Sequence, residues 1–143
     1  MPVIIESTAL SQEWNTLQNN YEQYEKSALL IKLAAIALCA IGLVLAVETT
    51  MIVAVVLVLW VQEGIFRTYQ SRLGDRLLRI EKLLAGEAQS EGAAFQLHTE
   101  WQVCRPGAVG LITQYAANIR KPTVAFPYAI LVVISLYYGL SGI

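Results

Sequence analysis

The sequence predicts an all-α integral membrane protein with three transmembrane helices, the first two forming a long antiparallel hairpin that extends into the cytoplasm. Three observations support this fold class: an apolar composition, three runs long enough to cross a bilayer, and a heptad pattern that outlasts the first two runs. Of 143 residues, 56% are hydrophobic and 15% are charged, and the mean hydropathy is +0.52. Soluble domains carry about 25% charged residues, so we expect a single membrane domain over 1–143.

Three apolar runs set the domain plan. They cover residues 28–47, 50–66 and 123–143, and a helix needs roughly 20 residues to cross about 30 Å of hydrocarbon. The segment between the first two runs, "ETT" at 48–50, is too short for anything but a tight helical hairpin. The plan therefore has a cytoplasmic extension and first span over 8–47, a second span and its extension over 50–86, a connector over 87–122 and a third span over 123–143.

The basic residues all lie on one side of this plan. Lys26 precedes the first span and Lys32 lies in its first turns. The others lie between the second and third spans: Arg67, Arg72, Arg76, Arg79, Lys82, Arg105, Arg120 and Lys121. By the positive-inside rule the N-terminus and 67–122 are cytoplasmic and the C-terminus faces outward. We expect an integral protein of the bacterial inner (plasma) membrane.

A heptad pattern continues beyond the membrane surface. The first arm has two rows spaced by seven residues and offset by four: Leu10, Leu17, Tyr24, Ile31, Leu38 and Leu45, and Trp14, Tyr21, Ala28, Ala35, Gly42 and Thr49. The second arm follows the same alternation: Ile52, Val56, Leu59, Glu63, Phe66, Gln70, Leu73, Leu77, Ile80 and Leu84. Such seams predict two helices that pack along each other. With a turn near residue 49, they would run together for about 35 residues, with Gly86 as the stop.

Two interpretations of the seam follow. In the first, the two arms pack on each other and fill the seam. In the second, one seam is reserved for another subunit or a partner helix, and its contact residues would be Trp14, Leu17, Tyr21, Tyr24, Leu73, Leu77 and Ile80. The first interpretation is the simpler one, because it needs no second chain.

Three charged residues lie close to the inner end of the first two spans. Glu63 falls on the seam, Arg67 follows it at i+4, and Lys32 is about level with residue 66 or 67 on the other arm. A charge this close to the hydrocarbon needs partners, so we expect an intramembrane charge cluster that fixes the register of the hairpin. An ion or proton site on an oligomer axis and a lipid-headgroup contact are the alternatives. We also expect Ala35 to lie opposite roughly Gly64.

The connector contains two short helical segments. Residues 87–92 read as a loop, whereas 93–104 fit either a strand or a helix, and in a helical protein we favour the helix. Residues 108–120 have one apolar face, formed by Val109, Ile112, Tyr115, Ala116 and Ile119. This helix would either rest on the inner leaflet or pack on the hairpin, and we favour packing.

The sequence contains no recognisable catalytic, metal-binding or cofactor-binding motif. Cys39 and Cys104 lie at different predicted depths, so we read both as packing residues rather than a disulfide. His98 is the only histidine, and with Glu100 and Cys104 it matches no structural zinc pattern. We therefore predict no catalytic, cofactor-binding or metal-binding residues, and no basic aromatic patch points to nucleic acid.

The function that fits these observations is a non-enzymatic one. We expect an oligomeric scaffold or a regulatory interaction subunit that acts through its cytoplasmic helical hairpin. The alternative is an oligomeric ion or proton channel with Glu63 and Lys32 near the conduction path. The expected partners are membrane lipid, further copies of the chain, and a cytoplasmic or membrane protein, because three spans enclose little interior of their own.

Overall fold

The computed structural model describes residues 2–86, 93–104 and 106–141, with the side chains of 2–6 and 104 outside the description. Its described residues form α1 (Pro2–Val44), α2 (Thr49–Leu84), α3 (Leu97–Cys104), α4 (Ala108–Ile119) and α5 (Pro122–Ser141). The predicted all-helical fold is confirmed. α1, α2 and α5 are long and apolar enough to cross a membrane, so the chain has the architecture of an integral membrane protein.

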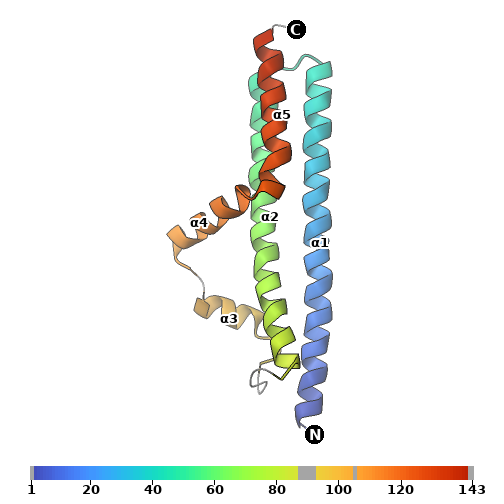
Figure 1. Cartoon of the computed structure of the whole chain (residues 1–143), viewed down its shortest axis with the longest axis vertical. Helices are drawn as coiled ribbons and strands as arrows, with labels where there is room; N and C mark the ends of the chain where they lie inside the picture. Colours follow the sequence, from blue (N-terminus) through green and yellow to red (C-terminus); the bar gives the residue numbers. More distant parts are fainter. Residues whose placement is uncertain (1, 87–92, 105, 142–143) are drawn as a thin grey trace.

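α1 and α2 form the predicted antiparallel hairpin and lie side by side along its length (Figure 1). α1 ends at Val44 rather than 47 because the N–H of Val47 donates to the carbonyl of Gly42 (2.9 Å) and Ala46 adopts a φ of 52°. This is how helices commonly terminate. The turn thus occupies 45–48 instead of centring near residue 49, which brings Lys32 opposite Glu63 rather than residue 66 or 67.

The other end of α2 behaves much as predicted. The helix ends at Leu84, two residues before the expected limit, and Gly86 follows with a φ of 77°. Glycine adopts this left-handed conformation without the steric penalty of a side chain. Lys82 lies in the last turn, where a cation favours the helix dipole. The predicted loop over 87–92 lies outside the described residues.

The structure has two hydrophobic cores, one in the part of the hairpin that water surrounds and one in the part that lipid surrounds. We call the part of α1 up to Lys26 and of α2 from Arg67 the polar half, and the remainder, together with α5, the membrane half. The polar half is filled by Leu10, Leu17, Leu77, Ile80 and Leu83, with Trp14, Tyr21 and Leu73 packed against them. The membrane half is filled by Ala35, Cys39, Ile52, Val56 and Tyr128.

Both heptad rows of α1 hold in the polar half. In the membrane half the row of Ala28, Ala35 and Gly42 is buried as predicted, and the row of Leu38 and Leu45 fails. Leu38 and Leu45, which the prediction placed on the seam, are exposed, whereas Cys39 is buried. A straight α-helix has 3.6 residues per turn and drifts by about 20° per heptad. The small side chains of Ala28, Ala35 and Gly42 leave the helix free to follow this drift, because close backbone approach needs no interlocking leucines.

α5 completes a three-helix bundle against the membrane half (Figure 1). It buries Val124, Tyr128 and Ser135 against its neighbours, and its other side chains face outward or are half-buried. A Cβ atom added at Gly139 would overlap the side chain of Thr49, so the absence of a side chain there lets the far end of α5 close onto the start of α2.

α3 and α4 project from one side of α2 (Figure 1), and we call these two helices, with residues 93–96 that precede α3, the arm. The helical interpretation of 93–104 is confirmed from Leu97 onward. The packing interpretation of α4 holds for its C-terminal end, where Asn118 is buried and donates to Thr68 Oγ1 (2.9 Å). Its first two turns leave Val109 and Ile112 exposed.

Gly64 is the point where α4 meets the hairpin. A Cβ atom added there would overlap the side chain of Ile119, and the carbonyl of Ile119 accepts a hydrogen bond from Trp60 Nε1 (3.1 Å). The expectation that Gly64 lies opposite Ala35 is therefore wrong. Ala35 belongs to the core of the membrane half with Cys39 and Val56, because the arms pair in the shifted register described above.

Substituting Gly64 should separate the arm from the hairpin. Gly64→Ala should lower the free energy of unfolding by about 1–3 kcal/mol, because the added methyl overpacks the contact with Ile119. Gly74→Ala is the matched control, since the new Cβ would stand at 3.4 Å from the Tyr21 ring, an ordinary contact. Denaturant unfolding in detergent, followed by circular dichroism, measures both. Equal stability of the two variants would contradict the assignment.

Candidate functional site

A buried carboxylate joins three helices where the membrane half meets the polar half. Glu63 on α2 is fully buried. Its Oε1 lies 3.1 Å from Lys32 Nζ on α1 and 3.6 Å from Arg67 Nε. Its Oε2 accepts a hydrogen bond from the hydroxyl of Tyr128 on α5 (2.9 Å). The three residues predicted to form a charge cluster are thus brought together, and α5 adds a fourth.

The geometry of this cluster indicates a structural tie. Oε1 is held by the charge of two cations rather than by an aligned hydrogen bond. Lys32 also donates to the carbonyl of Thr123 (2.9 Å), so the same ammonium links α1 to both other helices. The side chains of Lys32 and Arg67 keep 19% and 22% exposure. They can therefore remain partly hydrated while they neutralise Glu63.

Tyr128 is the member of this cluster that the sequence analysis did not assign. Its ring stacks on Trp60, with 6.0 Å between centroids and 5° between planes. A buried tyrosine normally finds a partner for its hydroxyl, so one signal was present. Helix α5 is apolar on all sides, however, and its sequence pattern does not show which face turns inward.

A second buried charge cluster lies in the polar half. The guanidinium of Arg76 donates to both carboxylate oxygens of Glu13 (2.9 and 3.0 Å), to Glu100 Oε1 (2.8 Å) and to the carbonyl of Ala93 (2.7 Å). Glu13 also accepts the N–H of Phe95 (2.6 Å). α1, α2 and the start of the arm are therefore joined through one arginine.

Electrostatics keep Arg76 charged in this position. Burial alone would lower its pKa, but the hydrogen bond and charge of Glu13, with the charge of Glu100, outweigh burial and raise the pKa above its usual value. The sequence did contain a signal for this pair. Glu13 precedes the seam residue Trp14 and Arg76 precedes Leu77, and positions flanking a seam often carry interhelical ion pairs.

The seam residues that were predicted as possible partner contacts pack against one another within the chain. Leu17, Leu77 and Ile80 are buried, and Trp14, Tyr21 and Leu73 pack against them. Trp14 Nε1 donates to Glu81 (3.1 Å), and Tyr24 stacks on Tyr69 with 6.3 Å between ring centroids. The structure thus corresponds to the first interpretation of the seam, and a partner would have to contact another surface.

Of the three residues weighed as metal ligands, the structure describes the side chains of His98 and Glu100. Within the described ranges no three His, Cys, Asp or Glu residues lie close enough to hold a metal ion. His98 is exposed, and Glu100 forms ion pairs with Arg76 and Arg79. The side chain of Cys104 lies outside the description. Cys39 is buried and forms no disulfide, and its Sγ lies 3.4 Å from the hydroxyl of Ser135.

Removing the charge of Glu63 should loosen the bundle. Glu63→Gln should lower the free energy of unfolding by about 2–3 kcal/mol, less than the roughly 3–5 kcal/mol lost with a deeply buried pair, because Lys32 and Arg67 stay partly hydrated. The control is Glu48→Gln, which changes an exposed carboxylate in the turn. Reversible unfolding in detergent measures both. If Glu48→Gln lowered the free energy of unfolding as much as Glu63→Gln, the link of α1, α2 and α5 through Glu63 would be excluded.

Two neighbouring arginines should differ sharply. Arg76→Met should cost about 3–5 kcal/mol, because it leaves the carboxylate of Glu13 buried without a cation. Arg79→Met should cost at most about 1 kcal/mol, because Arg79 is 59% exposed and its ion pair is screened by water. Thermal and denaturant unfolding of the two variants give the comparison. Similar losses would mean that burial does not set the strength of these pairs.

Comparison of the sequence with protein-family models and curated proteins, and of the structure with solved structures, found no match.

Proposed function

We propose that this chain is a non-enzymatic, membrane-anchored interaction protein. The hairpin acts as a rigid support that presents the α3–α4 arm to a protein partner on the basic side of the membrane. The observation that carries this proposal is the exposure of large apolar side chains on the arm, away from the three membrane-spanning segments. The contact surface differs from the predicted seam, which is filled within the chain.

The rigidity of the support follows from its two charge clusters. The Glu63 cluster ties α1 and α2 to α5, and the Arg76 cluster ties them to the start of the arm. The buried ionisable groups of both clusters are engaged with groups on other helices. This use of buried charge supports a structural role over a catalytic one, since a catalytic group must have capacity left for a substrate.

The arm carries the candidate contact surface. Phe95, Val103, Val109 and Ile112 are 66%, 82%, 79% and 67% exposed. Phe95 precedes α3, Val103 is in α3, and Val109 and Ile112 are in α4. Large exposed apolar side chains outside a membrane span favour an interaction site. These four lie on the same side of the plan as the basic residues, so the positive-inside rule places the arm in the cytoplasm. A bacterial inner membrane and a second copy or a cytoplasmic protein as partner complete the proposal.

The conduit alternative is not favoured by any contact. A conduit would need Glu63 and Lys32 to reach an axis between subunits. Glu63 is instead enclosed by α1, α2 and α5 of one chain, where Tyr128 and two cations occupy its oxygens. Opening this cluster toward an axis would break the tie among all three helices.

Photo-crosslinking in native membranes tests the proposed contact surface. A benzoylphenylalanine residue at Val103 or Ile112 should give discrete adducts of higher mass on irradiation, because both side chains are exposed on the arm. The same residue at Asn19, exposed on α1, is the control and should give none. Mass spectrometry then distinguishes a second copy from another protein. Adducts at Asn19 alone, or at no position in a folded protein, would overturn the proposal.

A further inference from the structure

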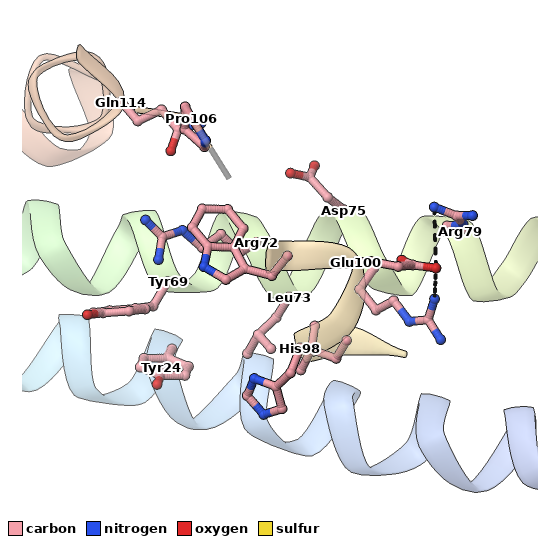
Figure 2. A pocket seen from close by; sticks show the side chains of 13 residues that line it. Tyr24, Tyr69, Arg72, Leu73, Asp75, Arg79, His98, Glu100, Pro106 and Gln114 are labelled. Atoms are coloured by element: carbon pink, nitrogen blue, oxygen red, sulfur yellow. Dashed lines mark hydrogen bonds and ion pairs between the residues drawn. The ribbon is translucent and has the colours of Figure 1, made fainter. Parts of the chain in front are cut away.

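A recess of about 560 Å³ lies between α2, α3 and the start of α4 (Figure 2). Tyr69, Arg72 and Asp75 line it from α2, and Pro106 and Gln114 lie across from them. Its wall combines aromatic rings with arginines, which is the lining expected for an anion attached to an organic group. Arg76 and Glu100 of the second charge cluster line one end of the recess, and no residue of the Glu63 cluster lines it.

Arg72 is the central side chain of this recess. Its guanidinium lies over the Trp101 ring at 4.0 Å and over the Tyr69 ring at 5.2 Å. A cation–π contact places the cation over the face of an aromatic ring. An arginine held in this way can still donate hydrogen bonds through its N–H groups.

One edge of Arg72 has two donors without an acceptor. Nε and Nη2 are buried and hydrogen-bonded to nothing within the part of the chain that the structure describes. These two nitrogens form the same side of the guanidinium, and their N–H bonds are parallel. Two parallel N–H donors match two oxygens of one phosphate or carboxylate, the bidentate geometry that arginine forms with such anions.

The other charged groups of the recess are already engaged or exposed. Arg76 donates four hydrogen bonds, to Glu13, Glu100 and the Ala93 carbonyl, and Arg79 pairs with Glu100. Asp75 is exposed at the rim. Arg72 is therefore the arginine of the recess whose buried donors lack an acceptor, and among the described residues Asp75 is the carboxylate of the recess without an ion pair.

The depth of Arg72 favours phosphate over carboxylate. The apolar stretch of α2 ends at Arg67, and Arg72 follows five residues later, about 7–8 Å along the axis. Side chains on a helix lean toward its N-terminus, which for α2 is the membrane side, and the contact with Tyr69 at i−3 shows this lean. If the hydrocarbon ends at Arg67, the guanidinium falls within the headgroup layer, which extends about 5–7 Å beyond the hydrocarbon.

We infer that this recess binds a phosphate group through the Nε and Nη2 edge of Arg72, with Trp101 and Tyr69 holding the guanidinium plane. The phosphate comes from an anionic lipid headgroup or from a soluble phosphate ester, since both offer the same paired oxygens. This site goes beyond the proposed partner contact, because it uses none of the four exposed apolar residues of the arm.

Native mass spectrometry of the full chain released from lipid nanodiscs tests the site. With equal amounts of phosphatidylglycerol and phosphatidylcholine, the wild type should retain one phosphatidylglycerol about tenfold in preference. Arg72→Gln should abolish this preference. Arg72→Lys should also reduce it severalfold, because lysine keeps the charge and loses the paired edge. The matched control, Arg120→Gln, removes an exposed arginine near the same depth and should keep the preference.

The outcomes separate the site from general charge attraction. An equal loss in Arg72→Gln and Arg120→Gln, or an unchanged preference in Arg72→Lys, would overturn the proposal. If Arg72→Gln fails to fold by circular dichroism, the wild type and Arg72→Lys decide the question. A wild type without preference for phosphatidylglycerol that also shows no binding of inorganic phosphate by ³¹P line broadening excludes the site.

The source of the phosphate is read from the same samples. Retained phosphatidylglycerol that inorganic phosphate at millimolar concentration does not displace identifies a lipid. Line broadening of inorganic phosphate by the wild type and not by Arg72→Gln, without lipid preference, identifies a soluble ester. These measurements do not depend on crosslinking at Val103. The phosphate site can therefore be disproved without disproving the partner contact of the arm, and the reverse.

Discussion

The carboxylate of Glu63 is the constraint on which the rest of this structure depends. It contacts Lys32 on α1, lies one turn from Arg67 on its own helix and accepts the hydroxyl of Tyr128 on α5. A charge near hydrocarbon is tolerated only with partners, so the three helices must meet at this height. Once Lys32 faces Glu63, the register of the hairpin is set. Glu13 then falls opposite Arg76, and the arm follows from Arg76 through the Ala93 carbonyl.

The two halves of the hairpin are stabilised by different physics. In the polar half, burial of leucine and aromatic area drives association because water surrounds the helices. In the membrane half the surrounding lipid is as apolar as the side chains, so Ala28, Ala35 and Gly42 allow close backbone packing instead. The buried pair Cys39 and Ser135 adds a polar contact between α1 and α5. Glu63 lies where one regime gives way to the other.

Much of the fold is predictable from the sequence because hydropathy and seam periodicity are local signals. They identify three spans, the hairpin and the proximity of Lys32, Glu63 and Arg67. They do not identify Tyr128, because an apolar helix has no polar face to orient it. The predicted turn was centred too close to residue 49, which shifted the predicted pairing of the two arms. The left-handed conformation of Ala46, which ends α1 early, is not evident from the neighbouring residues. The contact of Arg72 with Trp101 depends on the path of the connector, which no periodicity encodes.

Arg72, Arg76 and Arg79 follow one another along the same region of α2, yet their surroundings give them three different properties. Arg79 is exposed and its pairing is screened. Arg76 is buried and donates four hydrogen bonds to groups of other segments, so it holds α1, α2 and α3 together. Arg72 is covered by two rings with two buried donors unsatisfied, an arrangement that costs free energy until an anion arrives. Anything that binds only the folded state stabilises it. A phosphate on Arg72 would therefore also hold Trp101, and with it α3, against the hairpin.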